Sequence, residues 1–232
     1  ATTNDNDGAI NLGTLAVTGT ITLTTEGSGA ATIDNGTANI DIAAASVGGN
    51  LTLTSGASTS GSNYAIMDSG TVTVGGNLIA TTNANNGVID LGTLAVDGTM
   101  ALTTHGTGAA TVVNDAGLNF AASTVRGAFS ATATTGNIID TGALTITGTS
   151  TFVTTANDAT ITLDQGGHAF TGALLITTND TGADTAGDVT ISAGSSATLD
   201  FGNSTIDGDL IATSSNATGI TDSGAMTVRG TS

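Results

Sequence analysis

A long internal duplication dominates this sequence. Residues 2–33 recur as residues 81–112, at an offset of 79 positions and with 22 of 32 residues identical. A shorter motif, Asp or Asn two residues before Gly, recurs as a series of nine copies: Asn11, Asp34, Asp68, Asp90, Asp115, Asp140, Asp164, Asp200 and Asp222. Successive glycines of this motif are 22–25 residues apart, except for two longer steps of 34 and 36 residues. A repeat of this length is typical of solenoid proteins, in which each repeat forms one turn that stacks on the next.

Apolar residues alternate with other residues after a second motif, in which an apolar residue stands two positions before Gly, as in Val47-Gly48-Gly49. Fifteen of the sixteen residues in the two resulting columns are apolar: Ile21, Leu51, Leu78, Met100, Phe129, Ser150, Leu174 and Leu210, then Leu23, Leu53, Ala80, Leu102, Ala131, Phe152, Ile176 and Ala212. A period of two indicates strands with one buried face. A third apolar run precedes the Asp-x-Gly motif, as at Ile138-Ile139.

These patterns predict an all-β fold. We expect residues 1–232 to form a single parallel β-solenoid segment of about nine coils of 22–25 residues, with two insertions and three short strands in each coil. The chain contains no proline, which agrees with this fold because each strand residue needs its N–H for the ladder. The repeat runs into both ends without a cap, so the segment is expected to continue in a longer chain or to stack end to end with other copies.

The charge of the chain excludes several classes of partner. Nineteen acidic residues face only two basic ones, Arg126 and Arg229, so the formal net charge is −17. Nucleic acids and anionic membranes need a basic surface and are therefore not expected as partners. No apolar run reaches the length of a membrane span, and the absence of cysteine excludes disulfides and Cys-zinc sites.

Two strings of residues resemble a known family. Asp140-Thr141-Gly142-Ala143-Leu144-Thr145-Ile146-Thr147-Gly148-Thr149 and Val47-Gly48-Gly49-Asn50-Leu51-Thr52-Leu53-Thr54 are similar to the repeats of bacterial exoproteins of the filamentous-haemagglutinin type, which are secreted by the two-partner route. The resemblance implies a right-handed parallel β-helix that serves as an extracellular adhesin shaft. Autotransporter passengers share this shaft design and are not distinguished from it by these residues.

The Asp-x-Gly motif places carboxylates where neighbouring coils meet. If the motifs form a single file about 4.8 Å apart, adjacent charges repel by roughly 1 kcal/mol in water. One interpretation is that each carboxylate caps a turn by bonding to the backbone, so that no cofactor is needed. The other is that Ca²⁺ bridges successive carboxylates, with these candidates: Asp68, Asp90, Asp115, Asp140, Asp164 and, in the excursion at 179–188, Asp180, Asp184 and Asp188.

Two arginines follow aspartates at one coil's distance. In the second motif, the residue between the apolar residue and Gly is an aspartate in one coil and an arginine in the next. This position predicts two ion pairs between adjacent coils, Asp97 with Arg126 and Asp207 with Arg229. We expect both pairs to be exposed and to stabilise the fold by at most about 1 kcal/mol each.

The two histidines do not form a recognisable catalytic arrangement. His168 occupies an apolar column and is predicted to be a packing residue, whereas His105 replaces Glu26 of the first copy and is predicted to lie in an exposed turn. Neither has a nucleophile or an acidic partner at a defined spacing, so the chain is not expected to be an enzyme.

The resulting functional hypothesis is a structural one. We expect an extracellular shaft or filament of a bacterial surface adhesin, which spans distance and contacts other copies, a cell-surface receptor or a glycan. The alternative is an ice-binding or carbohydrate-binding solenoid. Ice binding would use a column of threonines: Thr24, Thr54, Thr81, Thr103, Thr132, Thr177 and Thr213.

Overall fold

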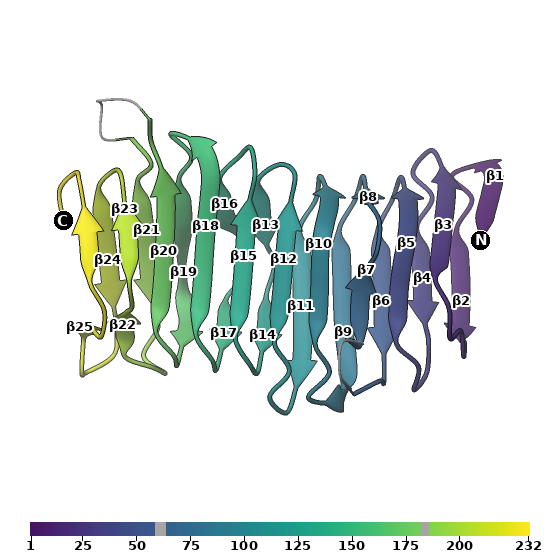
Figure 1. The fold of residues 1–232 in the computed structure, drawn as a ribbon, viewed down its shortest axis with the longest axis horizontal. Coiled ribbons are helices and arrows are strands. Elements are labelled where there is room, and N and C mark those ends of the chain that lie inside the picture. The colour runs from purple at the N-terminus through teal and green to yellow at the C-terminus, as the bar shows by residue number, and fades with distance from the viewer. Residues whose placement is uncertain (59–63, 182–185) are drawn as a thin grey trace. The chain divides into compact units, whose positions relative to one another are not determined.

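The computed structural model describes residues 1–58, 64–181 and 186–232, which form two compact units, residues 1–115 and 116–232. Each unit is a stack of parallel strands, and the two together contain about ten turns of a β-solenoid (Figure 1). The prediction of an all-β solenoid is therefore confirmed. Among the described residues there is no helix that is long and apolar enough to span a membrane.

Unit 1 contains two parallel sheets. The first has the order β1-β3-β5-β7-β10-β12, with β8 pairing with β5 and β10, and the second has the order β11-β9-β6-β4-β2. The strands are β1 (Thr2–Asn6), β2 (Ile10–Thr14), β3 (Ile21–Glu26), β4 (Ala31–Asp34), β5 (Ile40–Val47), β6 (Leu51–Ser55), β7 (Ile66–Asp68), β8 (Val72–Val74), β9 (Leu78–Asn85), β10 (Ile89–Val96), β11 (Met100–His105) and β12 (Ala110–Asn114).

Unit 2 repeats this design. One sheet has the order β15-β18-β20-β22-β25, with β23 pairing with β20 and β26; the other has the order β13-β16-β19-β17-β14, with β21 pairing with β19 and β24. The strands are β13 (Leu118–Phe120), β14 (Ser123–Val125), β15 (Phe129–Ala133), β16 (Ile138–Asp140), β17 (Leu144–Ile146), β18 (Ser150–Asn157), β19 (Ile161–Phe170), β20 (Leu174–Asn179), β21 (Val189–Ala193), β22 (Leu199–Phe201), β23 (Ser204–Ile206), β24 (Leu210–Ser214), β25 (Ile220–Asp222) and β26 (Met226–Val228).

The core of each unit is a file of apolar side chains that runs through the stacked turns. In unit 1, Leu51, Leu78 and Met100 occupy one register position in adjacent strands and are fully buried. In unit 2, Phe120, Phe129, Phe152 and Phe170 form edge-to-face contacts, with ring centroids 5.4–6.3 Å apart. Such contacts add to the burial of apolar area, so these rings hold consecutive turns of unit 2 together.

The duplicated corners have the same backbone geometry. Asp7 and its equivalent Asn86 both adopt a left-handed conformation with φ of 64°. At the next corner of each copy, a Cβ on Gly29 would lie 2.3 Å from the carbonyl oxygen of Gly8, and a Cβ on Gly108 would meet the equivalent oxygen at 2.2 Å. Only glycine allows the turns to approach this closely.

Within each unit, the predicted columns are wrong at one step. Ile21 pairs with Ile42 in the first sheet, whereas Leu51 pairs with Ala31 in the second. In unit 2, Leu174 pairs with Phe201, and Leu210 pairs with Val189 in the other sheet. Each turn carries similar alternating strands on both of its sheets, so the alternation alone did not distinguish one sheet from the other.

Candidate functional site

The most strongly perturbed titratable side chains belong to a buried pair in unit 2. His168 lies on β19 and its Nε2 is 3.4 Å from Oδ2 of Asp140 on β16, with both side chains fully buried. The Nδ1 of His168 accepts a hydrogen bond from the backbone N–H of Leu144 at 2.9 Å. Because Nδ1 is an acceptor, the neutral imidazole carries its proton on Nε2, which faces the carboxylate.

Burial shifts the pKa of both members of this pair towards the neutral form. Desolvation raises the pKa of Asp140 from 3.8 to about 6; the charge of Asp164 also raises it, and hydrogen bonds from the backbone N–H groups of Asp164 and Gln165 oppose the rise. Desolvation lowers the pKa of His168 from 6.5 to about 4, against the opposite effect of Asp164. At neutral pH, His168 is therefore uncharged and Asp140 is ionised.

The surroundings of His168 give it a packing role. Its ring stacks on Phe170 with a centroid distance of 5.5 Å and an interplanar angle of 23°, and it is 0% exposed. The prediction of a buried packing histidine is confirmed. A pair without access to solvent does not contact a substrate, so its effect is on the stability of unit 2.

Asp140 as the partner of His168 was missed by the sequence reasoning. The sequence does show that both residues lie beside Asp-x-Gly corners. It does not show that their side chains meet, because that contact depends on how β16 and β19 pair. The Oδ1 of Asp140 accepts a hydrogen bond from the backbone N–H of Asp164 at 3.0 Å.

Asp68 shows how an Asp-x-Gly corner works. Its carboxylate accepts hydrogen bonds from the backbone N–H groups of Gly92 and Thr93, both at 2.8 Å, and from the Thr93 hydroxyl at 2.9 Å. Asp90 lies beside it, and the pKa of Asp90 is raised by burial and by the charge of Asp68. A carboxylate of one turn thus caps the corner of the next turn.

The carboxylates do not form the single file that was expected. Asp90 is in register with Met67, one residue from Asp68, and on its other side with Thr111. Of the other calcium candidates, Asp164 is exposed, and the backbone N–H of Asp115 donates to the carbonyl oxygen of Leu94. The backbone N–H of Asp180 donates to Oδ2 of Asp207. The Oδ1 of Asp188 accepts a hydrogen bond from the backbone N–H of Asp209. Asp184 lies outside the described residues.

Metal binding remains a prediction of the sequence. Across residues 1–58, 64–181 and 186–232, no three His, Cys, Asp or Glu side chains gather in a group that could hold a metal ion.

One of the two predicted ion pairs is present within unit 2. Nη1 of Arg229 lies 2.9 Å from Oδ1 of Asp207, and the other carboxylate oxygen accepts the backbone N–H of Asp180 at 2.9 Å. The pair was expected to be exposed, but the side chain of Asp207 is only 7% exposed, against 58% for Arg229. Asp97 and Arg126 belong to different units, so that pair remains a prediction.

Two buried asparagines were also missed. The side chain of Asn114 accepts the backbone N–H of Val96 and donates to the carbonyl of the same residue, and Asn35 holds Val17 in the same way. Asn35 and Asn114 are 79 positions apart, so the duplication was the signal that could have identified them.

The threonines of the predicted column share a register position only over a few adjacent strands. Thr54, Thr81 and Thr103 share one register position, but Thr24 pairs with Ser46 instead. In unit 2, Val153 stands between Thr132 and Thr177 in the same position. In the described strands, the predicted threonine column is therefore not continuous, and ice binding remains a prediction of the sequence.

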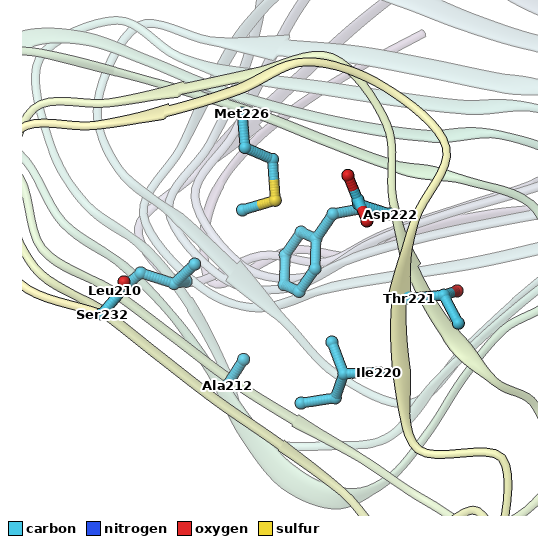
Figure 2. Close-up of a pocket in the computed structure, with 8 residues that line it drawn as sticks. Leu210, Ala212, Ile220, Thr221, Asp222, Met226 and Ser232 are labelled. Carbon is cyan, nitrogen blue, oxygen red and sulfur yellow. The ribbon is translucent and has the colours of Figure 1, made fainter.

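An apolar pocket of about 340 Å³ opens at the last strands of unit 2. Figure 2 shows its lining residues: Phe201, Leu210, Ala212, Ile220, Thr221, Asp222, Met226 and Ser232. Ile220 is 46% exposed, although its equivalents in inner turns are buried. Apart from Ser232, the lining residues lie on β22, β24, β25 and β26.

Comparison with known proteins gives one match. A family described as "Repeats of unknown function (DUF5649)" matches residues 107–177 and 186–232, which together make up just over half of the chain. Neither the curated proteins nor the solved structures contain a match to the chain.

Proposed function

We propose that the chain, which belongs to this family of repeats of unknown function, is a structural shaft of an extracellular bacterial adhesin of the filamentous-haemagglutinin type. Such a shaft separates a binding region from the cell that produces it and presents a polar surface to receptors or glycans. Secretion by the two-partner route is part of this proposal.

The observation that carries the proposal is the continuous register of successive turns within each unit. Leu51, Leu78 and Met100 pair strand by strand in unit 1, and Val189 pairs with Leu210 in unit 2. Backbone hydrogen bonds and buried side chains thus run in the stacking direction, which gives a repeat structure its stiffness and lets it lengthen turn by turn.

The distribution of polar groups supports the same role. The titratable pair of His168 and Asp140 is sealed in the core, and the carboxylate of Asp68 is occupied by backbone N–H groups. The side chains that face outward along the strands are mainly short and polar, such as Thr52 and Thr73. This arrangement stabilises turns and leaves a hydrated outer surface.

Antibody labelling of the producing cells tests the location. An antibody against the chain should label intact cells as strongly as permeabilised cells, and external protease should remove the label. Labelling that requires permeabilisation would contradict an extracellular shaft.

Shortening the protein tests the spacer role. Deletion of residues 2–80 removes one duplicated unit and joins the preceding sequence to residues that are nearly identical to those removed. The shortened protein should still reach the cell surface. Compared with the full-length protein, it should bind more weakly to a target that lies beneath a layer of other surface molecules. Equal binding by the shortened and full-length proteins at every depth of the target would contradict the spacer role.

A further inference from the structure

The corner of β19 is longer than the corners of the turns that precede and follow it. Strand pairing joins Ile139 to Thr162 before this corner and Thr145 to Ala169 after it. The two residues of β19 are seven positions apart and their partners only six, and the pairing of β19 with β21 also shifts at this place. Residues 164–167, which we call the β19 corner, are all exposed. A turn with more residues than its neighbours bulges out of the ladder.

Between the two preceding turns, backbone carbonyls close the ladder at both ends of the corner. At one end, the N–H of Thr141 donates to the carbonyl oxygen of Phe120 at 2.8 Å. At the other end, the N–H of Ser123 donates to the carbonyl oxygen of Ala143 at 3.2 Å. Strand pairing reaches up to these bonds on both sides, in β13 with β16 and in β14 with β17. These bonds show how a regular corner of unit 2 stacks.

Side chains replace both carbonyl oxygens at the β19 corner. At its beginning, the N–H of Asp164 donates to Oδ1 of Asp140 at 3.0 Å, and the N–H of Gln165 also donates to this carboxylate. At its end, the N–H of Leu144 donates to Nδ1 of His168 at 2.9 Å. The carboxylate and the imidazole thus occupy the places that backbone carbonyls occupy between the two preceding turns.

The two replacing side chains also meet each other. Nε2 of His168 lies 3.4 Å from Oδ2 of Asp140, and both side chains are fully buried. A buried imidazole or carboxylate that loses its partner is costly, so each side chain depends on the other. The His168 ring also stacks on Phe170 in the core. The pair therefore connects the beginning and the end of the β19 corner beneath its exposed residues.

The glycines of the β19 corner have more room than those of a stacked corner. A Cβ on Gly166 would meet its nearest atom, Oγ of Ser192, at 3.9 Å. By contrast, a Cβ on Gly148 would lie 2.6 Å from the backbone nitrogen of Ala128. The backbone of the β19 corner is therefore not pressed against the neighbouring turns, whereas that of the corner at Gly148 is.

A corner shorter by one residue would give the competing register. It would pair Thr145 with His168 in place of Ala169, and a slip of one residue moves every side chain to the other face of the strand. The imidazole would then face solvent and Phe170 would leave the core. The observed register buries both rings, and the hydrogen bonds of His168 with Leu144 and its contact with Asp140 compensate for burial of the imidazole.

We propose that Asp140 and His168 act together as an anchor that holds the β19 corner in a fixed position outside the stack. The anchor closes the ladder beneath the corner with side chains, so the turn keeps its register although its corner is longer. The solenoid can thereby present an exposed loop that includes Asp164 and Gln165. This role goes beyond the proposed shaft, which requires only stacked turns, and surface labelling and the spacer test do not depend on it.

Hydrogen exchange of single backbone amides tests the anchor. His168→Phe keeps a ring on Phe170 but cannot accept a hydrogen bond, so the amide of Leu144 should exchange about tenfold faster or more. His168→Asn, whose Oδ1 can accept from Leu144, is the matched control and should keep this amide protected. The amide of Ile138, which donates to Thr160 in the regular ladder, is the reference in both variants. Equal exchange of Leu144 relative to Ile138 in the two variants would refute the anchor.

Insertion of a short Gly-Ser linker tests the position of the corner outside the stack. Between Gly166 and Gly167 the linker should leave the melting temperature unchanged, because the anchor closes the ladder beneath it. The same linker between Gly148 and Thr149 is the matched control and should lower the melting temperature, because that corner has no free space. In the His168→Phe background, the linker in the β19 corner should also lower it. Equal losses at the two corners of the otherwise native chain would overturn the proposal.

Discussion

Replacement of Asp140 by asparagine should make the stability of the protein depend on pH between pH 4 and pH 6.5, because it removes a contribution that offsets that of His168 in the native chain. In the native chain the folded-state pKa of Asp140 is raised to about 6 from 3.8, and that of His168 is lowered to about 4 from 6.5. The folded state therefore binds more protons than the unfolded state at Asp140, and fewer at His168. These opposite effects largely cancel between pH 4 and pH 6.

The magnitude follows from the two shifts. Each is about two pKa units, and one unit corresponds to 1.36 kcal/mol, so each residue contributes a change of about 3 kcal/mol. With Asp140→Asn only His168 remains, and the free energy of unfolding should rise by about 3 kcal/mol from pH 4 to pH 6.5. With His168→Asn, whose Oδ1 can still accept from Leu144, the free energy should instead fall by about 3 kcal/mol as the pH rises from 3.8 to 6.

Urea denaturation at a series of pH values, followed by circular dichroism, measures these slopes. The other acidic residues contribute equally to all three proteins, so the comparison uses the difference between each variant and the native chain. A constant loss of stability in either variant does not affect the slope. Parallel pH profiles for the three proteins would refute the assignment of the buried pair.

Three further outcomes follow from the structure. Phe152→Ala removes the ring that contacts three other phenylalanines in unit 2 and should lower the free energy of unfolding by about 3–5 kcal/mol, whereas Phe152→Leu should cost less than about 1.5 kcal/mol in the same urea titration. Asn114→Ala leaves the backbone N–H of Val96 unpaired and should cost about 1–3 kcal/mol; no loss would show that water replaces the side chain. Because the carboxylate of Asp68 is already used by the backbone, melting curves in calcium and in EDTA should coincide, and a calcium-dependent rise in melting temperature would instead support the bridged carboxylates.

The pairing of distant residues could not be derived from the repeat. The motif spacing placed Asp140 and His168 in successive coils, but their contact depends on which side chains of β16 and β19 point inward. The pair of Asp207 and Arg229 was predicted correctly because it follows the register of adjacent turns, whereas the burial of Asp207 was not, because it depends on Asp180 in a neighbouring loop.

The sequence by itself determined the solenoid, the alternation of buried and outward residues, and the Asp-x-Gly corners. These features depend on local spacing: a strand has a period of two, and a turn repeats its corner residues. The tertiary structure decided which sheet each strand joins, that Asp90 stacks on Met67 and not on Asp68, and that His168 meets Asp140. Two strands with the same alternation fit either sheet, and only the packing of the whole turn distinguishes them.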